Sequence, residues 1–190
     1  MKNPEVYLKE AVKESLDLKK RFFDENSGQI LAFFHALEKI RETRKQALIF
    51  GNGGSAADAQ HFASELMHRV ETRPIGIKAH ALHTDTSLTT ALGNDEGFQH
   101  VYARQIEMLA EASDMAIAIS TSGNSTNIVE ALRKARERRC LTVGLLGRDG
   151  GKCNELCEIA LVVPGKSTPR IQEVHGMIIH LVCQMLEQNT

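Results

Sequence analysis

The feature that most constrains the fold of this chain is a short apolar run that breaks into a polar, glycine-containing loop and then into a helical pattern. It occurs twice: residues 47–50 lead into Gly51-Asn52-Gly53-Gly54-Ser55, and residues 115–119 lead into Ser120-Thr121-Ser122-Gly123-Asn124-Ser125. Apolar runs of this length, bounded by turn residues, are typical of strands buried in a parallel sheet. Because ligands of such sheets bind at the carboxyl ends of the strands, the pattern predicts two polar loops at a binding edge.

The second loop has the composition of an anion site. Its hydroxyls donate hydrogen bonds, Gly123 allows the backbone to approach closely, and Ser125 stands where a helix N-cap belongs. The free N–H groups and the positive dipole end of the next helix favour a phosphate. An ordinary capped strand-to-helix turn explains the same residues about equally well, since the loop is neither a Walker loop nor a dinucleotide fingerprint.

Strand and helix patterns alternate along the rest of the chain. We expect strands at 47–50, 79–82, 114–119, 141–146 and 159–163, helices around His61 and at 85–92, 101–110, 127–138 and 170–187, and irregular backbone at 94–97 and 147–151. This alternation predicts an α/β fold with a doubly wound, five-stranded parallel sheet flanked by helices, of flavodoxin-like type. No linker divides the chain, so we expect one domain over residues 1–190, with N-terminal helices in 1–44 and the α/β core in 45–190.

Two helices precede the first strand. Asn3-Pro4 predicts the start of one of them, and Leu8, Val12 and Leu16 follow at helical spacing. After a break at 24–27, a second apolar face runs from residue 30 to residue 40. Because these faces are wide, we assign them partly to the sheet and partly to packing in a homo-oligomer.

The composition excludes several classes of protein. A formal charge of -1 and 42% hydrophobic residues suit a globular domain, and the densest basic run, 133–139, has the pattern of a solvated helix face, so no nucleic acid partner is expected. There is no secretory signal, and no apolar stretch approaches the ~20 residues of a membrane span, so we expect a cytoplasmic protein without a membrane partner. The four cysteines do not form a disulfide framework or a complete zinc set, and we interpret them as structural and reduced.

Histidine and glutamate side chains raise the question of a metal. His61 and Glu65 are four residues apart on one predicted helix, so both point the same way, and imidazole and carboxylate are zinc ligands. Such a pair is more often a surface hydrogen bond. The last helix adds Gln172, His175 and His180, and a histidine within its apolar stretch needs a partner, either in the core or on a metal.

The chain from Gly51 to Ala63, the loop from Ser120 to Ser125, and Arg170-Ile171-Gln172-Glu173 with His180 closely resemble the phosphoheptose isomerases, a branch of the SIS (sugar isomerase) domain family. The resemblance covers nearly the whole chain and is weakest over the first 40 residues. It implies reversible conversion of D-sedoheptulose 7-phosphate, a phosphorylated seven-carbon sugar, to D-glycero-D-manno-heptose 7-phosphate, as in lipopolysaccharide biosynthesis. It also implies a homotetramer.

The resemblance carries site residues with it. It implies one Zn2+ per subunit, bound by His61, Glu65, Gln172 and His180. It places the phosphate on Ser120, Thr121, Ser122 and Ser125, and the rest of the substrate on Asn52, Gly53, Gly54, Ser55, Asn94, Asp95 and Gln172. Arg69 matches an active-site arginine of the family. Pro169 stands where some members carry an acidic residue, so no carboxylate acts from that position here.

The implied chemistry agrees with these residue types. Aldose–ketose isomerisation moves a proton between C1 and C2, so it needs a base, an acid and stabilisation of an enediol oxygen. We assign the base to Glu65 and the acid to His180, with zinc polarising the sugar oxygens. Two alternatives are a non-catalytic SIS protein that binds the replication initiator and a phosphosugar-sensing module. Retention of the four implied ligands together argues against both.

Helix geometry adds a constraint on the implied zinc site. Gln172 and His180 are eight residues apart, which on a continuous helix means about 12 Å of rise and roughly 80° of rotation. Side chains of that length can hardly converge on one ion through bonds of ~2.1 Å. If both residues are ligands, we expect them to come from different chains, with each site shared between subunits.

Overall fold

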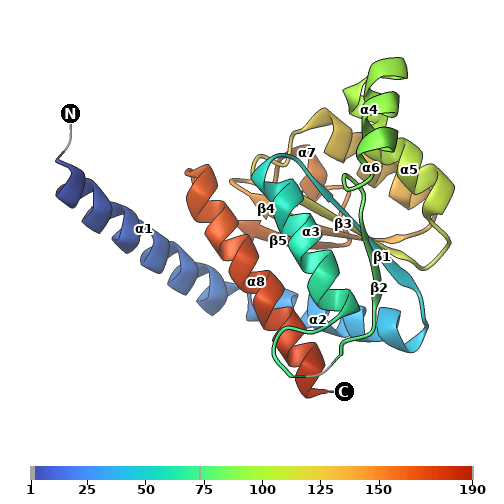
Figure 1. The fold of residues 1–190 in the computed structure, drawn as a ribbon. Helices are drawn as coiled ribbons and strands as arrows, with labels where there is room; N and C mark the ends of the chain where they lie inside the picture. The colour runs from blue at the N-terminus through green and yellow to red at the C-terminus, as the bar shows by residue number, and fades with distance from the viewer. Residues whose placement is uncertain (1–2, 73, 190) are drawn as a thin grey trace.

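The computed structural model describes residues 3–72 and 74–189 and shows a five-stranded parallel sheet with helices on both faces (Figure 1). Its strands are β1 (Gln46–Gly51), β2 (Lys78–Ala81), β3 (Met115–Ser120), β4 (Leu141–Gly147) and β5 (Ile159–Val163). They lie in the order β2-β1-β3-β4-β5, and every neighbouring pair is parallel. The predicted doubly wound sheet is confirmed. Because the strand order reverses between β1 and β3, these two strands form the switch point where such sheets bind ligands.

The helices divide between the two faces of the sheet. They are α1 (Pro4–Glu25), α2 (Ser27–Glu42), α3 (Gly54–Met67), α4 (Thr86–Asp95), α5 (Val101–Leu109), α6 (Thr126–Glu137), α7 (Gly151–Asn154) and α8 (Thr168–Gln188), with a short 3-10 helix, η1 (Phe98–His100). One hydrophobic core joins α1, α2, α3 and α8 to the sheet, and a second joins α5 and α6 to its other face. No helix in the described part of the chain is long and apolar enough to cross a bilayer.

The structure corrects the sequence prediction around residue 93. The helix expected to end at Gly93 continues to Asp95, so Asn94 and Asp95 are helical and not part of a loop. A glycine inside a helix costs only about 1 kcal/mol relative to alanine, which is too little to end a helix by itself. Two short elements, η1 and α7, were not predicted, and α7 begins within the segment expected to be a turn.

The first helix is only partly covered by its own chain. It starts as predicted, with Asn3 Oδ1 accepting the N–H of Glu5 at 2.9 Å. Its buried residues, Ser15, Leu18 and Phe22, all lie in the second half. The first half projects away from the body of the molecule (Figure 1). Several apolar side chains of α1, most of them in this first half, are between 48% and 63% exposed: Val6, Tyr7, Leu8, Val12 and Leu16.

Helices α3 and α8 lie side by side and run in the same direction (Figure 1). At one end of their contact, Gly54 lies against the side chain of Gln172. Farther along, Glu65 lies against His180. We call this line of contact the α3–α8 seam, and both parts of the candidate site lie along it.

Candidate active site

The two polar loops meet in one pocket at the carboxyl edge of the sheet. The pocket has a volume of about 190 Å³ and is lined by Asn52, Gly54, Ser55, Ile119, Ser120, Thr121, Ser122, Ser125, Thr168 and Gln172. The helices α3, α6 and α8 all begin there. Among these described residues there is no ionisable side chain, so hydroxyls, amides and three helix N-termini would hold an anion in this pocket.

The serine hydroxyls of the second loop are already oriented. Ser120 Oγ accepts the N–H of Gly123 at 3.1 Å, and Ser122 Oγ accepts the N–H of Asn124 at 3.2 Å. Since each hydroxyl is an acceptor in these bonds, its own O–H remains available to donate. Gly123 has φ +62°, and a Cβ there would lie 1.9 Å from the carbonyl oxygen of Gly150. This turn therefore requires glycine.

Ser125 occupies the predicted N-cap position of α6, but its side chain makes no capping hydrogen bond. The predicted N-cap position is confirmed, but the alternative of an ordinary turn capped by this side chain is not supported. The Ser125 hydroxyl is not used to hold the helix and lines the pocket instead.

Buried hydrogen bonds that sequence reasoning missed hold the first loop in place. The side-chain amides of Asn52 and Asn127 pair reciprocally, at 2.9 and 2.8 Å. Tyr102 Oη donates to the carbonyl oxygen of Gly51 at 2.5 Å, and burial raises the pKa of Tyr102 to about 12, so the hydroxyl stays protonated. No local pattern connects these residues, because the pairing of β1 with β3 brings Asn127 to Asn52, and the packing of α5 against the sheet brings Tyr102 to Gly51.

The start of α8 closes the pocket. A Cβ on Gly54 would lie 2.6 Å from Nε2 of Gln172, so glycine is what allows this close approach of α3 to α8. Thr168, the first residue of α8, is a lining residue that sequence reasoning missed. The sequence feature that could have identified Thr168 is the proline that follows it, because proline is favoured in the first turn of a helix and Pro169 therefore marks the start of α8.

A compact group of His61, Glu65 and His180 lies farther along the α3–α8 seam. Nε2 of His61 is 2.9 Å and Nδ1 of His180 is 3.1 Å from the same Oε1 of Glu65. The Glu65 side chain is only 9% exposed, whereas both histidines are 46% exposed. The buried thiol of Cys183 lies beside this carboxylate, and burial together with the charge of Glu65 raises the pKa of that thiol.

This His61–Glu65–His180 group fits a metal ion. One potential ligand atom from each residue lies within 4.8 Å of the other two. Glu65 Oε2 is buried and has no hydrogen-bond partner among the described residues. An unpartnered buried oxygen is costly, and a cation would satisfy it. Two imidazoles and a carboxylate suit zinc and related divalent ions.

Gln172 is not part of this group within one chain. Helix α8 is unbroken from Thr168 to Gln188, so Gln172 and His180 lie about 12 Å apart along its axis. Gln172 belongs to the pocket and His180 to the His61–Glu65–His180 group. One chain therefore brings together three of the four predicted zinc ligands.

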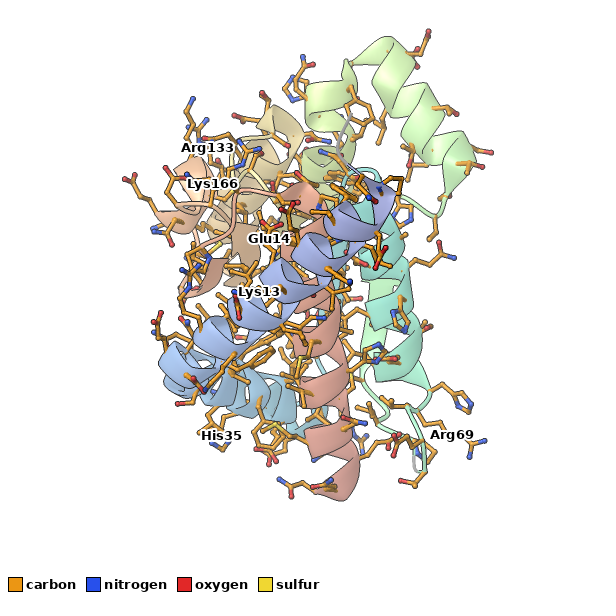
Figure 2. All side chains as sticks on the ribbon, turned by 90° about the vertical axis from the view of Figure 1, so that its left-hand side faces the viewer. Lys13, Glu14, His35, Arg69, Arg133 and Lys166 are labelled. Carbon is orange, nitrogen blue, oxygen red and sulfur yellow. The ribbon has the colours of Figure 1, made fainter. Side chains whose placement is uncertain are left out.

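Three other predicted substrate-binding residues lie outside the pocket. Arg69 is exposed and follows the end of α3, at the opposite end of that helix from the pocket (Figure 2). Asn94 Nδ2 donates to Asp95 Oδ1 at 2.7 Å in the last turn of α4, a helix with no buried residue. Gly53, by contrast, lies between two residues of the pocket wall and forms the N-cap of α3. The substrate-binding roles of all four residues stay predictions.

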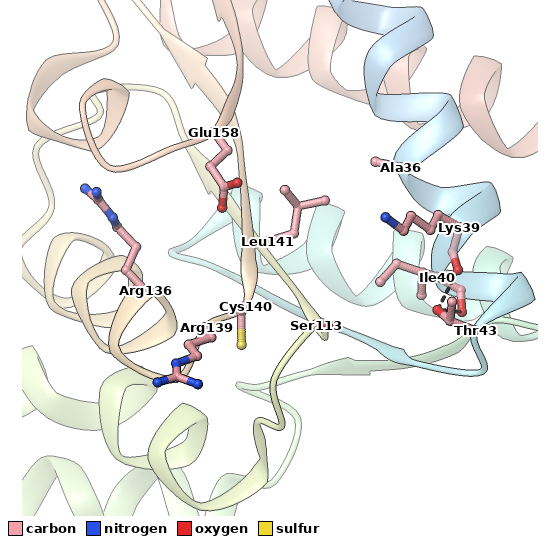
Figure 3. Close-up of a pocket in the computed structure, with 10 residues that line it drawn as sticks. All are labelled: Ala36, Lys39, Ile40, Thr43, Ser113, Arg136, Arg139, Cys140, Leu141 and Glu158. Carbon is pink, nitrogen blue, oxygen red and sulfur yellow. Dashed lines mark hydrogen bonds between the residues drawn. The ribbon is translucent and has the colours of Figure 1, made fainter.

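A second pocket, of about 540 Å³, lies at the amino edge of the sheet (Figure 3). Its wall includes Lys39, Arg136, Arg139 and Glu158 around the thiol of Cys140, whose pKa burial raises to about 11. The helices that border it, α2 and α6, end there. Basic side chains at these ends complement the negative end of each helix dipole. The helix ends thus account for the basic side chains of this second pocket. We therefore take the pocket at the carboxyl edge as the candidate site.

Comparison with known proteins gives first the class and then the family. Residues 11–147 match the SIS domain family, which defines the class of this protein. The phosphoheptose isomerase of Aliarcobacter butzleri is 55% identical over 152 residues, which are 80% of each chain. That of Geobacter sulfurreducens is 51% identical over 164 residues, covering 86% of this chain and 87% of its own.

A solved structure supports the same assignment. The phosphoheptose isomerase from Neisseria gonorrhoeae superposes with a TM-score of 0.92 at 37% identity, covering 98% of this chain and 100% of that one. Within the SIS-domain proteins, the chain belongs to the phosphoheptose isomerase family.

Proposed function

We propose that the protein interconverts D-sedoheptulose 7-phosphate and D-glycero-D-manno-heptose 7-phosphate, and so supplies a heptose precursor for surface glycans. The observation that carries this proposal is the presence, along one α3–α8 seam, of an anion pocket and the His61–Glu65–His180 group. A phosphosugar sensor needs only the pocket, and a scaffold that binds a replication initiator needs neither. The names of relatives that are 51% and 55% identical to this chain support the same activity.

In this proposal, the pocket holds the phosphate of the sugar. Ser120, Thr121, Ser122 and Ser125 donate hydrogen bonds to it, and the amides at the start of α6 face the same charge. Asn52, Ser55 and Gln172 contact the adjoining sugar. Binding energy from this non-reacting end orients C1 and C2 for the proton transfer.

Glu65 acts as the base and His180 as the acid. Oε1 of Glu65 contacts both histidine rings, whereas Oε2 has no hydrogen-bond partner in the part of the chain that the structure describes, so the carboxylate retains capacity to accept a proton. His180 is 46% exposed, so protons exchange between its ring and solvent. A base and an acid held side by side match a reaction that takes a proton from one carbon and protonates its neighbour.

His61, Glu65 and His180, together with Gln172, would hold one Zn2+ per subunit. The ion supplies a Lewis acid that polarises the carbonyl or hydroxyl oxygens of the sugar. Glu65 then has two roles, as ligand and as base. A residue that holds a metal tightly does not shuttle a proton freely, so Glu65 or His180 would have to give up its contact with the ion in order to act on the substrate.

We further infer a homotetramer whose sites are shared between subunits. The unbroken α8 keeps Gln172 about 12 Å from His180 in one chain. Gln172 and the pocket of one subunit would therefore meet the His61–Glu65–His180 group of another. The exposed apolar side chains in the first half of α1 supply packing surface for such an assembly.

The test is turnover by the purified, zinc-supplemented protein. D-sedoheptulose 7-phosphate is incubated with the protein in deuterated water, and formation of the aldose is followed by NMR. We expect conversion with deuterium incorporated from solvent at the carbon that is reprotonated, since the proton passes through a base that exchanges with solvent. A folded, zinc-loaded protein that gives no aldose would refute the proposal.

A further inference from the structure

The last turn of α8 contains a buried carboxylate that binds three consecutive backbone amides. Glu187 is only 4% exposed. Its Oε1 accepts the N–H groups of Val70, at 2.5 Å, and Glu71, at 3.0 Å. Its Oε2 accepts the N–H and the hydroxyl of Thr72, at 3.3 and 3.4 Å. These four residues form what we call the Glu187 clamp.

The position of this carboxylate is unfavourable unless the clamp forms. A negative charge in the last turn of a helix faces the negative end of the helix dipole. Burial also raises the pKa of Glu187, but the amides of Glu71, Val70 and Thr72 outweigh it, and the net shift is downward. Successive N–H groups that surround one anion form a concave binding site of the kind proteins use for phosphates. Here the chain uses that arrangement to fix its own loop.

The fixed segment is the one that carries Arg69. Residues 68–72 follow α3 directly, and Arg69 lies just before the first amide in the clamp. Further hydrogen bonds join the N–H of Ile75 to the carbonyl of His68, at 2.8 Å, and that of Ile77 to the carbonyl of Leu66, at 2.9 Å. The guanidinium of Arg69 itself points outward, beside the C-terminal half of α8 (Figure 2).

We propose that Glu187 is a positioning residue, which fixes the backbone immediately after Arg69 and thereby the place of the guanidinium relative to the His61–Glu65–His180 group. Glu187 lies seven residues after His180, nearly two helical turns, so both project from the same side of α8. One rigid helix then positions the acid of the reaction and, through the clamp, a cation for the anionic oxygens of the substrate. The catalytic part of this inference rests on the proposed function.

Hydrogen exchange tests the clamp without any substrate. Glu187→Gln keeps the size of the side chain but removes the charge and two acceptor lone pairs. We expect the amides of residues 70–72 to exchange at least ~10-fold faster, since a hydrogen bond to a charged group is the stronger kind. Gln184→Ala is the matched control, because it removes only the side-chain bond to Glu71 from the same helix. Unchanged exchange in a folded Glu187→Gln protein would overturn the clamp.

A double-mutant cycle tests whether Glu187 acts through Arg69. We expect Glu187→Gln to lower kcat/KM about 10-fold when Arg69 is present and less than ~2-fold in the Arg69→Ala background, since coupled residues are non-additive. Equal losses in both backgrounds would overturn the positioning role. If Glu187→Gln does not fold, Glu187→Asp serves the same cycle, because it keeps the charge but falls short of the three amides. A wild-type protein without turnover would refute the proposed function, while the exchange experiment would still decide the clamp.

Discussion

The two parts of the site lie along one seam but are built differently. The pocket consists mainly of loop residues contiguous in sequence, held by glycines and hydroxyls at the ends of β1 and β3. The His61–Glu65–His180 group consists of side chains from two regular helices and depends on how α3 packs against α8. In the proposed function, loop chemistry therefore determines anion binding, whereas the register of two helices determines where proton transfer would occur.

This difference predicts that substitutions in the two parts of the site change different kinetic constants. Changes in the pocket should alter binding of the ground state and the transition state alike, and so raise KM. Changes in the His61–Glu65–His180 group should alter the transition state alone and so lower kcat. The predictions below test this division, beginning with the largest expected effect.

Glu65→Gln should lower kcat by about 100- to 10,000-fold with little change in KM, because it removes a general base at nearly constant volume. Steady-state turnover of the heptulose phosphate provides the measurement. Glu155→Gln is the control and should leave kcat unchanged, because this exposed glutamate follows α7 on the face of the sheet opposite α3 and α8. A large rise in KM with normal kcat would show that Glu65 binds substrate instead of reacting.

The second prediction concerns α8, which both parts of the site share. His175 is fully buried between Gln172 and His180, its Nε2 lies 3.0 Å from the carbonyl oxygen of Leu146, and burial lowers its pKa to about 4. An unperturbed histidine, as in an unfolded chain, has a pKa of about 6.5. The unfolded state therefore binds the proton more readily, and stability falls as pH drops from 6.5 to 4, by about 3 kcal/mol.

Urea unfolding at a series of pH values measures this slope. His175→Gln should flatten the dependence between pH 6.5 and 4, whatever its effect at neutral pH. His68→Gln, which alters an exposed histidine, should leave the slope as it is. An equally steep loss of stability in the His175→Gln protein would mean that other groups cause it.

The third prediction concerns the pocket. Replacing both Ser120 and Ser122 by alanine should raise KM at least ~100-fold, since hydrogen bonds to a charged group contribute about 1.5–3 kcal/mol each and about 1.4 kcal/mol corresponds to a factor of ten. Little change in kcat is expected, because the phosphate is remote from C1 and C2. Ser87→Ala on the exposed α4 serves as control. A loss confined to kcat would contradict the proposed role of the loop.

The smallest expected signal tests whether the two parts come from different chains. Gln172→Ala and His180→Ala proteins, each inactive alone, are mixed under conditions that allow subunits to exchange. If each site takes Gln172 from one chain and His180 from another, random mixing restores about a quarter of the sites. Absence of recovery in proven mixed oligomers would show that both residues serve one site from one chain.

Features built from residues that are contiguous in sequence could be predicted, whereas features that depend on packing between distant elements could not. Strands were predicted to within a residue or two, and β5 without error, because buried parallel strands form uninterrupted apolar runs. The loop residues of the pocket could be predicted because they are contiguous in sequence. His61 and Glu65 could be predicted as an i, i+4 pair. The contact of His180 with Glu65, 115 residues earlier in the sequence, depends instead on the packing of α8 against α3.

Other features had no local signal. The pairing of Asn52 with Asn127 depends on strand order, and the bond from Tyr102 to Gly51 depends on how α5 packs against the sheet. The Glu187 clamp depends on the fold of the loop after α3, which no periodic pattern specifies. The end of α4 was misplaced because Gly93 was given more weight than its helix propensity justifies.

None of the described residues that line the pocket is ionisable, and this determines how its affinity responds to salt and pH. Lysine- and arginine-based sites weaken as salt screens their charges. Here the donors are neutral and fixed by the fold, so the only titration within the pocket is that of the bound phosphate ester, whose second pKa is about 6. Acidification below that value therefore weakens binding by protonating the ligand, and this binding surface stays the same across the physiological pH range.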